Sequence, residues 1–154
     1  MIIDQRVTLP APADKVWDFL MDVPAVSTCV PGVESVSQIG PNTYAGALKV
    51  KVGPIGVRLE GQIVLAERDR DAWRARMDLQ AADKRVNGAV SAKMTLELVP
   101  HTPTDTEMTI HTDANIMGKL GEFGQAVMRK KADQIMAEFA RNMAAAVGPQ
   151  QVSK

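Results

Sequence analysis

The chain has 154 residues, 45% of them hydrophobic, and its 18 basic residues balance its 18 acidic ones. This size and composition suit one domain with its own hydrophobic core, and a formal net charge of zero gives no general attraction to nucleic acid. A single cysteine, Cys29, excludes an internal disulfide and leaves no Cys/His cluster for a structural zinc ion, which fits the reducing cytoplasm.

The first predicted elements are a strand and two short helices. Residues 2–9 (IIDQRVTL) are expected to form a strand that ends at Pro10, because proline has no N–H to offer a neighbouring strand. A helix begins near Ala13, and its apolar residues recur at helical spacing: Val16, Trp17, Leu20 and Met21. Pro24 opens a second short helix, which is expected to end near Gly32.

From Val33 the pattern changes to alternation, which predicts six further strands. Hairpin turns are expected at 40–42, 53–54, 69–71, 83–88 and 101–105. Apolar residues occupy one face: Leu48, Val50, Val52, Val57, Leu59, Ile63, Leu65, Trp73, Met77, Leu79, Val90, Met94, Leu96, Leu98, Met108, Ile110, Ala114 and Ile116. Such alternation is typical of an antiparallel sheet with one solvated face, whereas buried parallel strands read as continuous apolar runs.

The remainder predicts one long helix over about residues 120–147. From Met128 onward an apolar stripe follows its helical period: Ala132, Ile135, Phe139, Met143 and Val147. Gly121 and Gly124 are expected to let the first turn bend. The predicted fold is therefore α+β, with a seven-stranded curved antiparallel sheet around a long C-terminal helix, in a single domain over 1–148 with a short flexible tail at 149–154.

A sheet of this width has more apolar surface than two short helices can cover, so the long helix must lie across it. A bent sheet that grips a helix tends to leave a gap, and the nine methionines suit irregular or variable neighbours. Only 4% of the chain is aromatic, so few large rings can fill the interior. The sequence thus favours an apolar binding cavity; the alternative is that Met and Ala simply pack a closed core.

Candidate lining residues follow from the predicted inner faces, although a slip of one residue in register would invert a strand's contribution. They are Leu48, Val50, Leu59, Ile63, Met77, Leu79, Met94, Ile110, Thr112, Phe123, Val127, Ile135 and Phe139. Thr112 is the one polar side chain placed inward on the last strand, where its hydroxyl is expected to bond either a guest carbonyl or, preferably, the backbone.

No catalytic constellation is found among the inward positions, and no metal site is expected. His111 alternates onto the wet face with Glu107 and Asp113, and His101 lies in a turn. Cys29 sits between apolar stretches and is expected to be a buried, inert thiol. The glycine-rich GKLGEFG run at 118–124 lacks the Gly-Lys-Ser/Thr ending of a phosphate loop, so it is expected to allow close approach of the helix start to the sheet.

Contact with a membrane is limited by the sequence. The N-terminus lacks the pattern of a secretory leader, and no segment reaches the roughly 18 apolar residues of a spanning helix, so a soluble, unprocessed protein is expected. The apolar Pro54-Ile55 tip, flanked by Lys49, Lys51 and Arg58, could touch a membrane surface or a partner. The favoured alternative is a tight hairpin folded back on the core. Arg129, Lys130 and Lys131 could extend a basic rim, but a solvated helix face is the favoured interpretation of these three charges.

Four segments resemble the G-subunit family of carbon monoxide dehydrogenase, within the START-like (SRPBCC) helix-grip superfamily: APADKVWDFLMDV, CVPGVES, KVGPIGVRLEGQI and ANIMGKLGEFGQAVMRKKADQIMAEFARNM. The resemblance covers about residues 1–145, and the last, glycine-containing run is its most specific part. It implies an apolar cavity between sheet and helix. Its mouth would be rimmed by Gly53, Pro54, Ile55, Gly56, Asn87, Gly88, Gly121 and Gly124. Members of the family are associated with molybdenum hydroxylases and have been linked to membrane attachment and to carrying quinone.

The leading hypothesis is a non-catalytic carrier of an apolar, lipid-like molecule, with an isoprenoid quinone favoured, and with no tightly bound cofactor. Its expected partners are a carbon monoxide dehydrogenase type molybdenum hydroxylase and, transiently, the inner membrane surface; nucleic acid is not expected. The first alternative is a cyclase or hydrolase of the same superfamily. The second is an assembly factor that acts through its surface and would tolerate sealing of the cavity by Ala114→Phe.

Overall fold

The seven predicted strands form one antiparallel sheet, in which the first strand pairs with the last. The structure, a computed structural model, describes residues 1–149. The strands lie in the order β1-β7-β6-β5-β4-β3-β2. The elements are β1 (Ile2–Leu9), α1 (Ala13–Met21), α2 (Val23–Ser27), β2 (Val33–Gly40), β3 (Thr43–Val52), β4 (Ile55–Asp69), β5 (Arg74–Asp83), the 3₁₀ helix η1 (Lys84–Val86), β6 (Gly88–Thr102), β7 (Asp105–Gly118), the 3₁₀ helix η2 (Lys119–Phe123) and α3 (Gln125–Val147).

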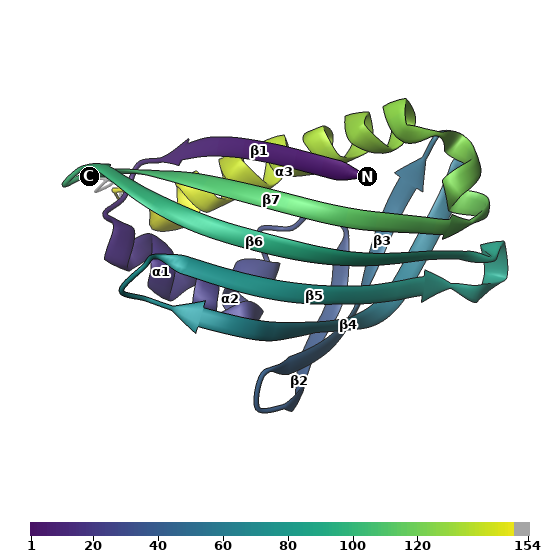
Figure 1. The fold of residues 1–154 in the computed structure, drawn as a ribbon, viewed down its shortest axis with the longest axis horizontal. Helices are drawn as coiled ribbons and strands as arrows, with labels where there is room; N and C mark the ends of the chain where they lie inside the picture. The colour runs from purple at the N-terminus through teal and green to yellow at the C-terminus, as the bar shows by residue number, and fades with distance from the viewer. Residues whose placement is uncertain (150–154) are drawn as a thin grey trace, which may run out of the picture.

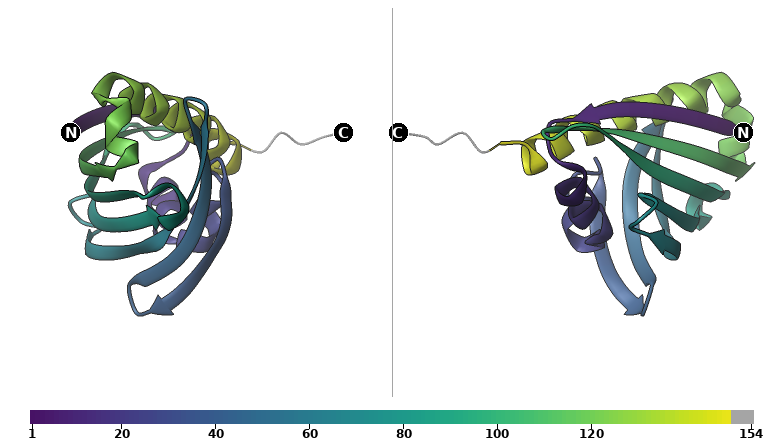
Figure 2. Two further views of the ribbon diagram at one scale, coloured as in Figure 1. Left: turned by 90° about the vertical axis from the view of Figure 1, so that its right-hand side faces the viewer. Right: turned by 60° about the vertical axis from the view of Figure 1, so that its left-hand side comes forward.

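The long helix α3 lies across the concave side of the curled sheet, and α1 and α2 cover one end (Figures 1 and 2). Gln5 in β1 ties the middle of α3 to the edge strand. Its Nε2 donates to the Ala132 carbonyl 3.2 Å away and to Asp133 Oδ1 3.1 Å away. This arrangement confirms the predicted fold, a seven-stranded curved sheet around a long C-terminal helix with two short helices after the first strand.

One face of the sheet is apolar and turned toward α3; we call it the inner face. The register aligns its residues in rows, with Leu48 opposite Leu59 and with Met77 opposite Met94, which in turn faces Thr112. Because successive side chains of a strand alternate between faces, charged neighbours such as Lys49 lie on the outer face, where they are exposed. The predicted alternation is therefore confirmed.

Two glycines allow the sheet to bend sharply between β2 and β5. Gly46 and Gly61 lie directly opposite each other on β3 and β4. A Cβ atom on Gly61 would overlap the Gln80 carbonyl oxygen, and one on Gly46 would lie 2.5 Å from the Ser35 carbonyl oxygen. Only glycine lets the strands approach this closely, so these two positions set the curvature that wraps the sheet around the helix.

Two apolar clusters close the ends of the inner face. The main core joins α1, the C-terminal half of α3 and the nearby strand ends, and it contains Leu9, Ala11, Val16, Trp17, Leu20, Cys29, Ala75, Leu96, Leu98, Met108, Ile110, Phe139, Met143 and Val147. At the other end, Val52, Val57 and Leu120 form what we call the hairpin-end cluster.

The long helix begins five residues later than predicted. Lys119–Phe123 forms the separate 3₁₀ helix η2, and α3 starts only at Gln125. Gly124 stands between them with a φ of 81°, a left-handed conformation that no α-helix can continue through. The second short helix, α2, likewise ends at Ser27, before the predicted end near Gly32.

Trp73 lies in the β4–β5 turn and not in the strand to which it was assigned. β5 begins at Arg74, and Trp73 has a φ of 53°, which is unusual for a bulky residue. Its ring packs edge to face on Trp17 of α1 with 5.9 Å between ring centroids, and its carbonyl accepts a hydrogen bond from Leu98 N. These contacts hold the turn against the main core.

Among residues 1–149, no helix combines the length and the apolar character that crossing a membrane requires. Of the predicted tail at 149–154, all but Pro149 lies outside the described residues.

Candidate binding site between the sheet and the long helix

The structure places all nine predicted strand residues of the lining on the inner face. They come from five adjacent strands, β3 to β7, and the register aligns them across the sheet. Ile110 packs in the main core with Phe139 of α3, so this face is the one that the helix covers. The residues are Leu48, Val50, Leu59, Ile63, Met77, Leu79, Met94, Ile110 and Thr112.

Most of these side chains remain partly open to solvent although a helix lies over them. Ile110 is buried in the main core, and the other eight are half-buried. By contrast, inner-face residues at the two ends, such as Leu9 and Val57, are almost fully buried. Protein interiors are normally packed without gaps larger than a water molecule. The middle of the inner face is therefore less completely covered than its two ends, although Val50 and Leu59 pack against the hairpin-end cluster and Met94 packs against the main core.

Of the predicted residues of the long helix, two lie toward the sheet and one is exposed. Phe139 is buried in the main core, and Ile135 is half-buried, as expected for residues that face the sheet. Val127, however, is 40% exposed. It precedes Met128 by one position, which turns it about 100° around the helix axis. Met128, Ala132 and Met136 are half-buried, as Ile135 is, and lie on the side of the helix that is turned toward the sheet.

The predicted mouth residues come together at the hairpin end of the sheet, where the structure is closed by packing. A Cβ atom on Gly53 would lie 3.3 Å from the Phe123 ring. Ile55 and Phe123 both pack against the hairpin-end cluster, so the hairpin folds back on the core and leaves Pro54 exposed. The predicted rim residues come from three places. Those of the β3–β4 hairpin are Gly53, Pro54, Ile55 and Gly56; those around the start of β6 are Asn87 and Gly88; and those of η2 and the residue after it are Gly121 and Gly124.

Glycines permit this closure, as predicted for the GKLGEFG run. A Cβ atom on Gly88 would lie 2.7 Å from Leu120, and one on Gly118 would overlap the Asn87 carbonyl oxygen. Gly118 also has a φ of 67°, a conformation that favours glycine. Lys119 N donates to the Asn87 carbonyl at 2.9 Å, so η2 is bound directly to the turn before β6.

Asp83 is a buried acid of the hairpin end that the sequence analysis did not single out. Its carboxylate accepts hydrogen bonds from Arg58 N at 2.8 Å and from Arg85 N at 3.0 Å, and Arg85 Nη2 lies 3.3 Å away. The bond from the Arg58 backbone N–H holds the pKa of this carboxyl below its ordinary value; burial opposes this, and Arg85 reinforces it. Arg85 also donates to the Gly56 carbonyl at 3.2 Å, which links the turn before β6 to the β3–β4 hairpin.

Thr112 does not bond the backbone, contrary to the favoured expectation. Its side chain is half-buried on the inner face, and no side-chain hydrogen bond joins it to another described residue. The threonine of β7 that does bond the backbone is Thr106, which is fully buried and donates from Oγ1 to the Ala11 carbonyl at 2.7 Å.

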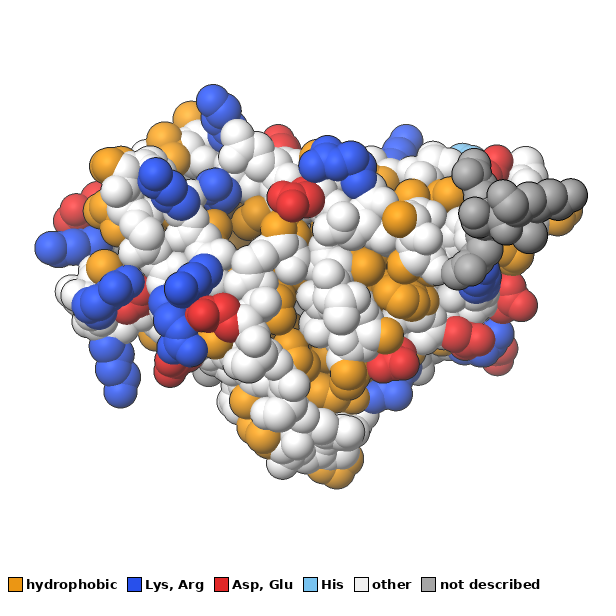
Figure 3. Space-filling view, turned by 180° about the vertical axis from the view of Figure 1, so that it is seen from behind, with side chains coloured by type: hydrophobic (Ala, Val, Ile, Leu, Met, Phe, Trp, Pro, Cys, Tyr) orange, Lys and Arg blue, Asp and Glu red, His pale blue; other side chains and the backbone are white. Residues whose placement is uncertain are grey.

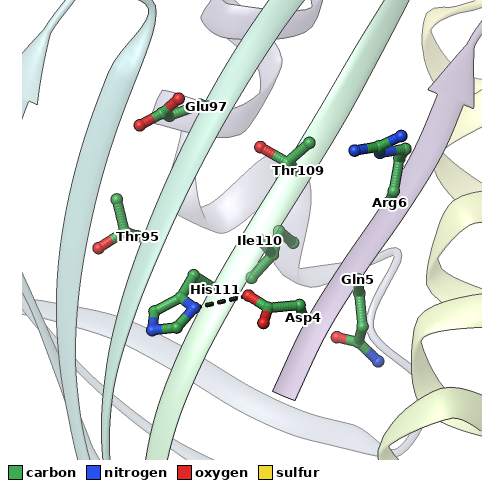
Figure 4. A pocket seen from close by; sticks show the side chains of 8 residues that line it. All are labelled: Asp4, Gln5, Arg6, Thr95, Glu97, Thr109, Ile110 and His111. Carbon is green, nitrogen blue, oxygen red and sulfur yellow. Dashed lines mark hydrogen bonds and ion pairs between the residues drawn. The ribbon is translucent and has the colours of Figure 1, made fainter. Parts of the chain in front are cut away.

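The outer face carries a polar hollow of about 490 Å³ between β1, β7 and β6 (Figure 4). His111 Nδ1 and Asp4 Oδ1 lie 2.6 Å apart in it, and Arg6 pairs with Glu107 at 3.0 Å. His111 is largely exposed, as predicted for the wet face, and so is its partner Asp4. Residues 1–149 contain no group of three or more His, Cys, Asp or Glu side chains that could hold a metal ion. A second hollow of about 260 Å³ lies between α2 and β2.

Cys29 is a free thiol buried in the main core, as predicted. Its carbonyl accepts a hydrogen bond from Asn142 Nδ2 of α3 at 3.0 Å, so the residue joins the segment after α2 to the long helix. Burial among apolar side chains keeps a thiol unreactive.

Solved structures with the same fold span nearly the whole chain. A conserved protein from Geobacillus kaustophilus has a TM-score of 0.87 at 20% identity, over 96% of this chain and 95% of that one. A START superfamily protein from Mycobacterium smegmatis has a TM-score of 0.66 at 12% identity, over 95% and 96%. The Zhui aromatase/cyclase from Streptomyces sp. R1128 has a TM-score of 0.61 at 17% identity, over 96% and 90%. The fold is thus START-like, and the proteins that share it include an enzyme, the aromatase/cyclase.

The sequence itself gives a more specific assignment. No curated protein matches the chain. The family model of CoxG, the G-subunit of carbon monoxide dehydrogenase, matches residues 6–148, which run from the second half of β1 to the end of α3. The chain therefore belongs to the CoxG family of carbon monoxide dehydrogenase.

Proposed function

We propose that this protein is a non-catalytic carrier that holds an apolar, lipid-like molecule between the sheet and α3. One observation carries the proposal: the apolar side chains along the middle of the inner face stay half-buried beneath the helix, while both ends are closed by packed clusters. A guest that covered these side chains would be favoured by about 25 cal/mol for each Å² of apolar surface removed from water.

The half-buried residues of the inner face, which we call the open stretch, suit a guest of variable shape; they are Leu48, Val50, Leu59, Ile63, Met77, Leu79, Met94 and Thr112. Leu, Ile and Val side chains come from β3 and β4, and methionines come from β5, β6 and α3. Methionine has three rotatable bonds and a polarisable sulfur, so it adapts to irregular neighbours. An isoprenoid quinone, which joins a flexible apolar tail to a flat ring, is the guest that we favour, and the family's association with a redox enzyme supports it.

Conversion of the guest lacks support on this face. Within the described strands the acidic side chain of the inner face is Asp83, and its carboxylate already accepts two backbone hydrogen bonds at the closed end. A general acid or base must reach the reacting atom of a bound substrate. Holding the guest, without changing it, is therefore the function that these side chains support.

The expected partners are a carbon monoxide dehydrogenase type molybdenum hydroxylase, in keeping with the family, and the membrane from which a quinone would be loaded. The hairpin end of the molecule supports transient contact with anionic lipid. Lysine and arginine side chains gather at this end (Figure 3). Among the described residues, Lys51, Lys84 and Lys119 form no salt bridge there, whereas Arg85 is paired with Asp83.

Filling the open stretch from the helix side tests the carrier proposal. Ala132 is half-buried on α3 opposite the inner face, and Ala137, on the same helix, is exposed. We expect Ala132→Phe to weaken binding of 2-methyl-1,4-naphthoquinone, measured by isothermal titration calorimetry, by at least about tenfold, because the new ring occupies the guest's space. Ala137→Phe is the matched control and should bind like the wild type.

Equal affinity of the wild type and Ala132→Phe would contradict the proposal. Ala114→Phe is a poorer test, because Ala114 is only 5% exposed and a larger side chain there would overpack the sheet at a cost of about 1–3 kcal/mol. In both Phe variants of α3, thermal unfolding followed by circular dichroism checks that the fold is retained.

A further inference from the structure

Tyr44 stands on the inner face beside the open stretch. It faces Ile63 across the β3–β4 ladder, and Ile63 in turn faces Leu79. Tyr44 forms a small buried cluster with Val23 and Leu65, against which Met77 packs. Tyr44 thus lies beside two half-buried residues of the open stretch, Ile63 across the ladder and Met77 in its cluster.

The Tyr44 hydroxyl is a polar group without a partner in an otherwise apolar setting. The residue is only 8% exposed, yet no hydrogen bond joins its hydroxyl to another described residue. The hydroxyl oxygen is also accessible to solvent. Among the described residues, the fully enclosed polar side-chain atom that lacks a hydrogen-bond partner is Asp78 Oδ1, on the outer face. Buried tyrosines normally find a partner for the hydroxyl. Because the oxygen is open, a molecule from outside the chain can reach it and accept a hydrogen bond from it.

We infer that Tyr44 is a ligand-contacting residue whose hydroxyl donates a hydrogen bond to a carbonyl oxygen of the bound apolar molecule. This inference rests on the proposed carrier function and specifies the ligand: an apolar body that bears at least one carbonyl, as in a quinone, a ketone or an ester. A pure hydrocarbon would leave the hydroxyl unpaired in a desolvated site, which is unfavourable. Tyr44 therefore selects carbonyl compounds over hydrocarbons of the same shape.

A pair of probes of equal shape isolates the carbonyl. The first is 2-methyl-1,4-naphthoquinone, and the second is 2-methylnaphthalene, which has the same ring skeleton without the oxygens. We expect Tyr44→Phe to weaken binding of the quinone by about five- to tenfold in a calorimetric titration, the worth of one hydrogen bond, and to leave binding of the hydrocarbon unchanged or tighter. Phe fills the same volume as Tyr, so the fold should be retained. Thr95→Val removes a half-buried hydroxyl from the outer face of β6; it is the matched control and should bind both probes as the wild type does.

An infrared measurement separates loss of the Tyr44 hydrogen bond from a change in the shape of the site. In the wild type, the infrared carbonyl stretch of the bound quinone should lie at lower frequency than in an apolar solvent, and Tyr44→Phe should abolish that shift. An unchanged carbonyl band in Tyr44→Phe, or equal weakening of both probes, would overturn the inference while leaving the carrier function standing. A wild type that binds neither probe would instead overturn the carrier function and this inference with it.

Discussion

Asp83 connects the end of β5 to the start of β4 and to the turn before β6. Its carboxylate accepts from the backbone N–H groups of Arg58 and Arg85, which belong to different elements. Ionised carboxylates form stronger hydrogen bonds than neutral ones. The charge on this one residue therefore helps to hold the closed end of the molecule together.

This role predicts how stability depends on pH. The pKa of Asp83 is lower in the folded protein than its ordinary value near 3.9, so its contribution is present above about pH 4 and is lost as the pH falls through the folded-state pKa. In urea unfolding between about pH 2.5 and 6, we expect the free energy of unfolding to fall less steeply with acid in Asp83→Asn than in the wild type. Asp71→Asn, at an exposed position in the β4–β5 turn, is the control. Identical slopes for all three proteins would show that the Asp83 charge is not used.

At the scale of elements, three segments meet at the hairpin end: the β3–β4 hairpin, η1 and η2. Each brings to one end of the molecule a lysine that forms no salt bridge with another described residue: Lys51, Lys84 and Lys119. The apolar residues of the same hairpin are packed inward, apart from the exposed Pro54. Contact with a membrane at this end would therefore be electrostatic and reversible, because little apolar surface is available to insert.

Vesicle binding tests this reading of the basic end. A basic residue near an anionic surface contributes about 1 kcal/mol, so the double variant Lys51→Glu/Lys119→Glu should bind phosphatidylglycerol vesicles at least about tenfold more weakly than the wild type in a sedimentation assay. Lys15→Glu/Lys93→Glu makes the same change in net charge at exposed positions on α1 and β6 and should bind as the wild type does. Equal losses in the two double variants would mean that only net charge matters.

The two halves of α3 differ in how deeply their side chains are buried, as do the parts of the sheet beneath them. Its C-terminal half is fixed in the main core by Phe139, Met143 and Val147, which are at most 9% exposed. In its N-terminal half, Met128 and Ala132 are only half-buried, and Met128 packs against the hairpin-end cluster. Local openings draw on the parts of a fold with the fewest buried contacts. We therefore expect the N-terminal half to move when a guest enters.

For the whole molecule, hydrophobic periodicity was enough to predict the architecture. Alternation in segments such as 44–52 fixed which residues face the helix, and the stripe from Met128 to Val147 fixed which side of α3 faces the sheet. The start of α3 was misplaced because the break depends on the φ angle of Gly124, which periodicity does not express. Val127 was misplaced because one step along a helix turns a side chain by about 100°.

Asp83 and Tyr44 escaped the sequence analysis for a different reason. Each matters through partners that are brought close only by strand pairing, as Arg58 is to Asp83, or through the lack of a partner in three dimensions. The aspartate that precedes the KRVNG turn is a weak local signal, since aspartate often accepts from the backbone two residues later. No local pattern marks an unpaired tyrosine hydroxyl.

The central claim, that the space between sheet and helix holds an apolar guest, is tested most directly by native mass spectrometry of protein purified gently and without detergent. The account predicts a species heavier than the bare chain by one apolar molecule, which is released on denaturation and is depleted in Ala132→Phe. Only the bare-chain mass, together with no measurable affinity for 2-methyl-1,4-naphthoquinone or for lipid, would contradict it.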